Sequence, residues 1–390
     1  MAHATLAPSS AERWLNCTPS ARLEQQFPDR AGDAAKEGTL AHTLGELLIR
    51  QKLKIINGLD SVRILENVQS DRFYTNAMME HADDYATFVV EKYSEALAVT
   101  SDAQIFIEQR IDLTDYVPEG FGTGDVFIIA DGTMRFIDLK YGKGHLVDAV
   151  ENRQMMLYAL GGLAHFDYLF DIREVEMTIY QPRLENFSTW RISVNELKAW
   201  GDTVLIPRAK LAFAGEGEQV PGKHCTFCRA KGICKALANQ NMQIEKYDYK
   251  PAQFLTPEEV SDILKKADVI EKWLKAVEDH ALYAAVHSGA KWPGFKLVEG
   301  RSNRKYADEE KIIEALTENG YSQDLFLKPK TLLGLTDLET KIGKKTFAEL
   351  LNQFIVKPAG APTLVPESDK RPALSSAESA AADFAGIEIS

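Results

Sequence analysis

Three residues in the first half of the chain could do chemistry together: Asp125, Asp138 and Lys140. They lie on two apolar, strand-like runs that are separated by Asp131-Gly132. Asp-Gly between apolar runs is typical of a two-residue hairpin loop, because a type I′ turn needs positive φ at both central positions. The register counted back from this loop places Asp125 directly opposite Asp138.

Two opposed carboxylates on one hairpin face need a cation between them, because like charges directly opposite each other are destabilising. Strand alternation places Lys140 on the same face as Asp138. Carboxylate oxygens bind Mg²⁺ or Mn²⁺, and such an ion can activate water and polarise a phosphoryl oxygen. The lysine can stabilise charge in the transition state. The alternative is a surface ion pair between Asp138 and Lys140, but both strands are apolar on both faces, and interior charges are costly unless they are used.

The elements that must position these residues alternate between helices and strands. Helical spacing of apolar residues dominates residues 37–54, 76–97, 148–163 and 195–214, and strand-like patterns cover 104–115, 125–130, 133–140, 173–181 and 187–193. The strand–strand–helix–strand order predicts a mixed α/β domain with a central sheet flanked by helices.

After Cys234 the pattern changes. Thr256-Pro257-Glu258-Glu259 is a capping box that predicts a long helix to about residue 287. Further helices are predicted over 308–319 and 345–354. From residue 358 the chain is rich in Ala, Ser and Pro, which is typical of a disordered tail. We therefore expect a catalytic domain over 1–240, a helical domain over 241–357 and a disordered tail over 358–390.

Composition restricts the protein class only loosely. The chain has 390 residues with 45% hydrophobic residues, and no apolar run approaches the length of a membrane span. No secretory signal pattern is present, so a cytosolic protein is expected. The net charge of −12 argues mildly against a nucleic-acid partner, but such binding depends on local basic surfaces.

The four cysteines also need an explanation. Cys225, Cys228 and Cys234 lie within ten residues of one another, and Cys17 stands far upstream. Disulfides are rare in the cytosol. Thiolates bind iron–sulfur clusters and structural zinc equally well, so spacing does not decide between the two. The remaining alternative is a set of buried free thiols.

The hairpin sequence GTGDVFII…FIDLKYGKG resembles the core of the PD-(D/E)xK nuclease superfamily, in which an acid is followed across a hairpin by an acid-x-Lys pair. The segment Glu37-Gly38-Thr39-Leu40-Ala41-His42 and the pair Gln154-x-x-x-Tyr158 resemble the RecB-like branch. Taken alone, His42 is an ordinary helix residue, and Gln154 and Tyr158 form a solvated helix face.

The resemblance implies a restriction-endonuclease-like α/β core and a set of site residues. It implies metal ligation by His42, Asp125, Asp138 and the backbone carbonyl of Leu139, and catalytic roles for Asp125, Asp138, Lys140, Gln154 and Tyr158. Glu108 also recurs in such proteins, as an accessory residue without an assigned role.

The cysteine segment resembles the C-terminal cluster of AddB-type nucleases, whose fourth cysteine lies upstream of the nuclease core. This resemblance implies a [4Fe–4S] cluster on Cys17, Cys225, Cys228 and Cys234, with zinc as the alternative. His224 could replace one ligand. The cluster would act as a staple between the start of the chain and the end of the catalytic domain.

Over residues 9–236 the chain is most similar to an uncharacterised, phage-encoded group of RecB-like nucleases. The implied activity is a Mg²⁺- or Mn²⁺-dependent DNA exonuclease in phage replication or recombination, in the cytoplasm of a bacterial host. The implied partners are DNA and a phage single-strand-binding or recombination protein; a homo-oligomer is compatible, and a membrane is not expected. Two other classes stay open: a catalytically inactive iron–sulfur DNA-binding module, and an iron–sulfur electron carrier or sensor.

Overall fold

A five-stranded mixed sheet forms the centre of the first half of the chain. Its strands follow one another in chain order: β1 (Gln104–Asp112), β2 (Phe121–Ala130), β3 (Gly132–Leu139), β4 (Ile172–Gln181) and β5 (Asn186–Ser193). β3 and β4 are parallel, and the other neighbours are antiparallel. A parallel pair needs a crossover connection, which α6 (Arg153–Phe166) supplies. The predicted mixed α/β class is confirmed.

The computed structural model describes residues 4–28, 32–166, 168, 170–242, 256–300, 305–328, 331–358, 360–366, 369 and 371–374. The chain divides into two compact units, Met1–Ile270 and Glu271–Ser390. In the described residues, no helix combines the length and the apolar character that crossing a bilayer requires.

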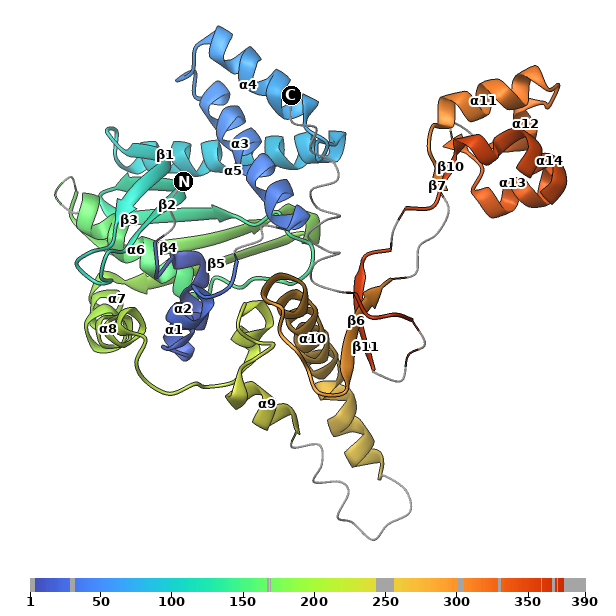
Figure 1. Cartoon of the computed structure of the whole chain (residues 1–390). Coiled ribbons are helices and arrows are strands. Elements are labelled where there is room, and N and C mark those ends of the chain that lie inside the picture. Colours follow the sequence, from blue (N-terminus) through green and yellow to red (C-terminus); the bar gives the residue numbers. More distant parts are fainter. Residues whose placement is uncertain are drawn as a thin grey trace, which may run out of the picture. The chain divides into compact units, whose positions relative to one another are not determined.

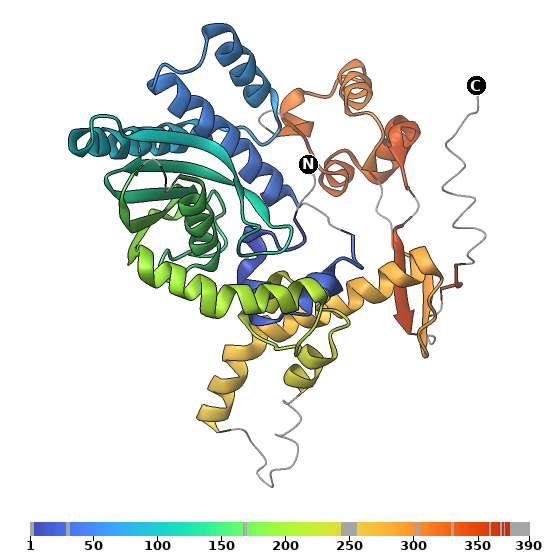
Figure 2. The same cartoon turned by 90° about the vertical axis from the view of Figure 1, so that its left-hand side faces the viewer.

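Helices cover both faces of the sheet. α3 (Asp33–Lys52), α4 (Gly58–Ser70) and α5 (Asn76–Val99) lie on one side, and α6, α7 (Val194–Trp200) and α8 (Ile206–Ala214) lie on the other (Figures 1 and 2). Two hydrophobic cores result. Val126 and Ile137 point into the core under α3 and α5, whereas Phe127 and Phe136 join the core under α6. Successive residues of β2 and β3 therefore alternate between two buried layers, as the apolar runs predicted.

The hairpin register is as predicted. Ala130 pairs with Thr133, and the ladder runs back to Val126 opposite Ile137. The turn differs from the prediction, because Gly132 has a φ of +80° and Asp131 is not among the described residues with positive φ. Gly132 donates its N–H to Asp171 O at 2.9 Å, so the turn residue also belongs to the start of the β3–β4 pairing. A type I′ turn is therefore wrong, although the loop length is right.

Two predicted helices differ in extent. α6 begins at Arg153 rather than near 148, because the Asn152 side chain accepts the N–H groups of Gln154 and Met155. The predicted helix 195–214 is α7 and α8 joined by a π-helical turn over Gly201–Leu205. Pro207 lies in the first turn of α8 and has no N–H to donate, which accounts for the irregular hydrogen bonding there.

The remaining elements of the first unit are short, apart from the start of a long helix. They are η1 (Pro8–Ser10), α1 (Ala11–Asn16), α2 (Ser20–Glu24), η2 (Pro182–Leu184), η4 (Lys223–Phe227) and α9 (Lys235–Asn241). The long helix α10 (Pro257–Ser288) spans the division between the units, and its predicted capping box is present: Thr256 and Glu259 exchange hydrogen bonds of 3.3 and 3.0 Å.

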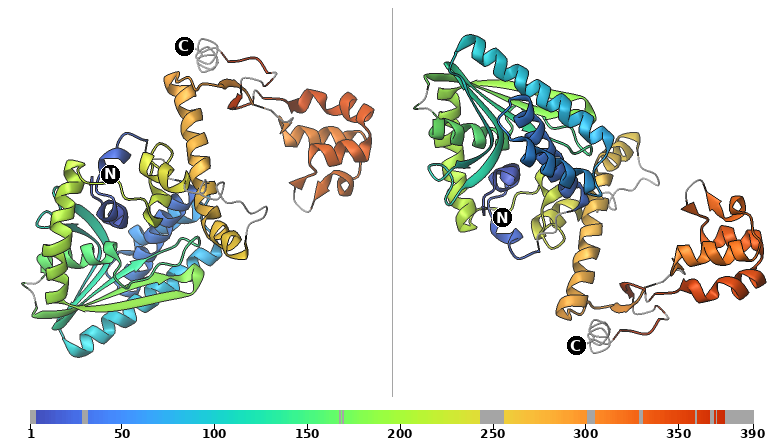
Figure 3. Two further views of the ribbon diagram at one scale, coloured as in Figure 1. Left: turned by 90° about the horizontal axis from the view of Figure 1, so that it is seen from below. Right: turned by 90° about the horizontal axis from the view of Figure 1, so that it is seen from above.

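The second unit combines helices with short strand pairs. Its helices are α11 (Glu309–Glu318), α12 (Gln323–Phe326), α13 (Leu335–Ile342), α14 (Lys344–Leu351) and η6 (Asn352–Phe354). Its strand pairs are β6 (Phe295–Glu299) with β11 (Pro362–Pro366), β7 (Lys305–Tyr306) with β10 (Ile355–Val356), and β8 (Leu327–Lys328) with β9 (Thr331–Leu332). α11 to α14 surround a small core that contains Ile312, Leu338 and Phe347 (Figure 3).

Part of the segment predicted as a disordered tail is strand. Pro362–Pro366 pairs antiparallel with β6 along five residue pairs, and Leu374 N donates to Leu297 O at 2.7 Å. Thr, Leu and Val between the two prolines favour an extended strand, a local signal that the overall composition of the segment conceals. Residues 375–390 lie outside the described part of the chain.

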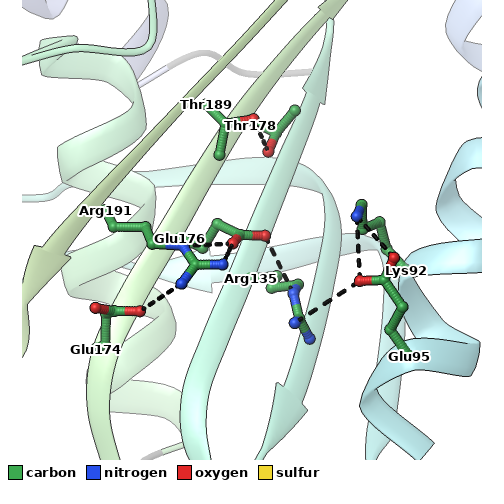
Figure 4. A network of polar contacts seen from close by, with 8 residues as sticks. All are labelled: Lys92, Glu95, Arg135, Glu174, Glu176, Thr178, Thr189 and Arg191. Atoms are coloured by element: carbon green, nitrogen blue, oxygen red, sulfur yellow. Dashed lines mark hydrogen bonds and ion pairs between the residues drawn. The ribbon is translucent and has the colours of Figure 1, made fainter.

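A polar network crosses the α5 face of the sheet. Glu176 of β4 is buried and accepts from Arg135 Nε of β3 at 3.1 Å and from Arg191 Nε of β5 at 2.8 Å (Figure 4). Arg135 also lies 4.0 Å from Glu95 of α5, which pairs with Lys92 at 2.8 Å. The buried carboxylate has two cationic partners, so three strands and one helix are connected without an uncompensated interior charge.

Two helical glycines should respond oppositely to alanine. A Cβ at Gly161 of α6 would overlap Ile111 and lie 2.6 Å from Leu113 Cδ2, whereas a Cβ at Gly38 of α3 meets nothing within 4 Å. We expect Gly161→Ala to destabilise the protein by about 1–3 kcal/mol through overpacking. Gly38→Ala should stabilise it by about 0.5–1 kcal/mol through helix propensity. Midpoints of thermal unfolding would test this, and shifts of the same sign in both variants would contradict the packing described.

Candidate functional site

Helix α3 brings His42 to the sheet. One turn after His42, Gly45 faces α5 and β3: a Cβ there would lie 3.0 Å from Tyr85 Cδ1 and 3.6 Å from Leu139 Cδ2. The absence of a side chain at this position permits close packing of α3, and the histidine of the same helix thereby reaches the acids of the neighbouring strands.

His42, Glu108 and Asp125 form the first part of the site. His42 Nδ1 lies 3.4 Å from Asp125 Oδ2 and 3.9 Å from Glu108 Oε1. One potential ligand atom from each residue lies within 4.8 Å of the other two. In the described part of the chain, no other group of three or more such residues meets this criterion. One imidazole nitrogen and two carboxylates are a donor set suited to a divalent cation.

Glu108 reaches this position through an unusual backbone conformation. It lies within β1 but has a φ of +51°, in the left-handed region that residues other than glycine rarely adopt. The β1–β2 pairs on either side, Ile107 with Val126 and Gln109 with Gly124, keep the same register. A single strained residue opposite Asp125 therefore interrupts an otherwise regular ladder, at a cost of about 1–3 kcal/mol.

Asp138, Lys140 and Gln154 form the second part of the site. Lys140 Nζ lies 2.8 Å from Asp138 Oδ2 and donates to Gln154 Oε1 at 3.0 Å. Gln154 Nε2 of α6 donates to Asp138 Oδ1 at 3.3 Å. Gln154 thus contacts both charged residues of the D-x-K sequence from the covering helix, and it is not on a solvated face.

The hairpin connects the two parts. Asp125 Oδ2 accepts the backbone N–H of Leu139 at 2.7 Å, so the first acid is bound to the strand that carries the second. The β2–β3 pairs end at Val126 with Ile137, one residue before the two acids. The preceding pair of this ladder is Phe127 with Phe136, whose rings stack at 4.7 Å. A rigid aromatic layer therefore lies next to the two acids in the sheet.

The charged groups of the site shift one another's pKa values. Burial lowers the pKa of His42, but Asp125 and Glu108 outweigh this and raise it well above its usual value. Burial likewise lowers the pKa of Lys140, but the charge and hydrogen bond of Asp138 outweigh burial, so the net direction is upward. Burial raises the pKa of Asp138, whereas His42 and the N–H of Leu139 hold that of Asp125 below its usual value. The site therefore has a negative potential that favours bound positive charge.

Two buried tyrosines lie in the same potential. Burial raises the pKa of Tyr158 and of Tyr85, and the charges of Asp125 and Asp138 raise both further. Tyr158 packs against Phe136 in the α6 core, with a ring-centroid distance of 5.2 Å, so its side chain is a core residue next to the site. Sequence reasoning missed Tyr85, whose buried hydroxyl has no hydrogen-bond partner among the residues that the structure describes. Its place in the apolar stripe of α5 carries no signal of a polar role.

The four cysteines line one pocket, together with His224 among others. In the part of the chain that the structure describes, no three of the four sulfurs lie within 4.8 Å of one another. Burial raises the pKa of the Cys228 thiol to about 12. His224, which also lines the pocket, donates Nε2–H to Val220 O at 2.8 Å.

The pocket joins segments that are distant in sequence. Glu24 of α2 is buried, pairs with Arg13 at 2.6 Å and accepts the backbone N–H of Arg229, next to Cys228, at 2.8 Å. Near Cys17, Thr18 Oγ1 donates to Glu216 O at 2.5 Å, and Arg208 of α8 donates to Leu15 O. The start of the chain is therefore fixed to the region after α8 by protein contacts alone.

Fold and site together define a mixed α/β protein with a histidine–carboxylate group, in which Asp125 is buried and His42 and Glu108 are half-buried, beside a lysine–aspartate pair. The chain belongs to a family described as "Protein of unknown function (DUF2800)", whose model matches residues 3–372. Among solved structures it is similar to one described as "Crystal structure of SSO0001", at 11% identity, covering 56% of this chain and 95% of that chain with a TM-score of 0.22.

Proposed function

We propose that this protein is a divalent-metal-dependent DNA nuclease that hydrolyses phosphodiester bonds. The observation that carries the proposal is that the β2–β3 hairpin joins the His42–Glu108–Asp125 group to the Asp138–Lys140–Gln154 group, through the hydrogen bond from Leu139 N–H to Asp125. It joins a donor set for a cation to a fixed amine beside a carboxylate, the combination that phosphodiester hydrolysis needs.

The two groups of residues would have different functions, one in cation binding and one in positioning the lysine amine. His42, Glu108 and Asp125 would hold the cation, which supplies Lewis acidity and lowers the pKa of water. Asp138 and Gln154 position the Lys140 amine by contacts of 2.8 and 3.0 Å. The amine then donates hydrogen bonds toward the phosphoryl group or the attacking water. Because an imidazole belongs to the ligand set, we expect Mn²⁺ to support activity better than Mg²⁺.

The resemblance to RecB-like PD-(D/E)xK nucleases supports the finer parts of this proposal. They are exonuclease action on DNA and a role in phage replication or recombination within a bacterial cytoplasm. The same resemblance, with the shared pocket of Cys17, Cys225, Cys228 and Cys234, supports a [4Fe–4S] cluster as a second, structural cofactor.

The direct test incubates the full-length protein with end-labelled linear DNA and with circular DNA, in Mg²⁺, Mn²⁺ or EDTA. We expect cation-dependent loss of the linear substrate only, faster with Mn²⁺. Lys140→Ala should cut the rate by roughly 10²-fold or more through loss of charge stabilisation. The absence of cleavage under every metal condition would refute the proposal and leave the inactive DNA-binding module. Cleavage of circular DNA would make the protein an endonuclease.

A further inference from the structure

Two surface segments of the first unit are basic in a chain whose net charge is −12. Residues 140–147, directly after β3, contain Lys140 and Lys143 and no acid. Residues 222–235, which carry three of the cysteines, contain Lys223, Arg229, Lys231 and Lys235 and no acid. Such local excess of cations is the charge pattern that phosphate backbones attract.

An aromatic contact joins these two segments. The rings of His145 and Phe227 lie 6.0 Å apart and nearly perpendicular, at 83°. Both residues are exposed; the exposed fraction of Phe227 is 68%, and that of the neighbouring Leu146 is 73%. Large apolar side chains at such exposure on a loop that starts at Lys140 indicate a contact surface and not a core.

Hydrogen bonds from the ends of β4 and β5 hold the backbone of residues 140–147 in place. Buried Gln181, the last residue of β4, donates Nε2 to Gly142 O at 2.9 Å and to His145 O at 2.8 Å, and accepts Val147 N–H at 3.2 Å. Asn186 Nδ2 of β5 donates to Val147 O at 2.8 Å. The backbone that presents Lys143 and His145 is therefore preorganised, which reduces the entropy that binding would cost.

We propose that residues 140–147 and 222–235 form a binding surface for a single DNA strand, on which a base stacks against Phe227 and meets the ring of His145 edge-on. Exposed rings flanked by cations are the elements with which proteins bind single strands without sequence preference. The surface is continuous with the proposed nuclease site through Lys140, and this assignment of a single-stranded substrate rests on the proposed function.

The test measures binding apart from cleavage. Anisotropy of a labelled 20-nucleotide oligo(dT), and of a duplex of equal length, is titrated with full-length protein in EDTA, where no metal-dependent cleavage occurs. We expect tighter binding of the single strand, and a loss of about tenfold in its affinity for Phe227→Ala and for His145→Ala. The double variant should lose less than the product of the two, because both rings would contact one base.

Three further variants make the result specific. Phe187→Ala removes an equally prominent ring from β5, 56% exposed, and should bind like the wild type. Phe227→Trp should keep the affinity, which separates stacking from a folding defect. Lys143→Ala should lower the salt slope of log K by about 0.7, as expected for one phosphate contact on a single strand.

The outcomes separate the two proposals. Unchanged affinity in Phe227→Ala and His145→Ala, or preference for the duplex, overturns the single-strand surface even if the wild type cleaves DNA. Ring-dependent strand binding in a wild type that never cleaves upholds the surface and overturns the nuclease.

Discussion

Replacing Asp125 with Asn should abolish DNA cleavage, with a fall of about 10³-fold or more, because several kcal/mol of metal-derived stabilisation are lost. Asp125 Oδ2 is the oxygen nearest to His42 Nδ1, at 3.4 Å, and it also accepts the Leu139 N–H at 2.7 Å. The amide of Asn can keep the hydrogen bond from Leu139 through its carbonyl oxygen. The change therefore removes the charge that attracts a cation and leaves the hairpin contact in place.

Metal binding provides a second readout that does not depend on DNA. A cation at 100 times its Kd should stabilise the wild type by about 2.7 kcal/mol, which raises the melting temperature by several degrees. We expect Asp125→Asn to lose this shift, and Glu108→Gln to reduce it. Asp102→Asn, an exposed acid just before β1, is the matched control and should behave like the wild type. A full Mn²⁺ shift in Asp125→Asn would place the cation elsewhere.

With the proposed [4Fe–4S] cluster, the wild-type protein should carry iron after anaerobic purification, and Cys228→Ser should lose nearly all of it. The thiol is buried in the shared pocket, and its pKa is raised to about 12 by burial, so it would be neutral without a bound metal. A hydroxyl in its place cannot supply the thiolate that iron–sulfur clusters require. Iron content and the visible absorption spectrum would measure the loss.

A second residue of the same pocket, His224, provides the control for Cys228→Ser. His224 also lines it, but its ring is hydrogen-bonded to Val220 O, so His224→Ala should keep the iron. Because Arg13, Glu24 and Arg208 connect the N-terminal segment without metal, the sheet of Cys228→Ser should remain folded and should keep its Mn²⁺ thermal shift. Zinc without iron in the wild type would contradict the cluster, and an iron-free His224→Ala would make the histidine a ligand.

The local parts of the site were predictable from sequence, and the long-range parts were not. A two-residue loop determines the register of its own hairpin, and this predicted register is present from Ala130–Thr133 to Val126–Ile137. The predicted pairing of Asp125 with Asp138 lies one step beyond these pairs and stays a prediction. The contact of Gln154 with Lys140 depends on how α6 crosses the sheet, which the sequence pattern does not show. Gln154 was singled out through the family resemblance alone.

Glu108 is the clearest limit of sequence reasoning. Its approach to His42 and Asp125 combines a left-handed backbone within a strand and the pairing of β1 with β2. Neither feature leaves a pattern in the sequence, because the same residue type, glutamate, occurs in ordinary and in left-handed backbone conformations. Tyr158 shows the opposite case: its helical spacing from Gln154 was read correctly, but the depth at which α6 packs makes it a core residue.

The fixing of the N-terminal segment has a consequence for biosynthesis. Thr18 and Glu216 are 198 residues apart in sequence, and Arg22 donates to Phe213 O across 191 residues. Thr18 and Arg22 are therefore synthesised long before these contacts can form, since the contacts wait for α8 to be made. We expect cofactor insertion at the cysteines to be a late maturation step. Pulsed thiol labelling during refolding would test it, and Cys17 should become protected only after the sheet has formed.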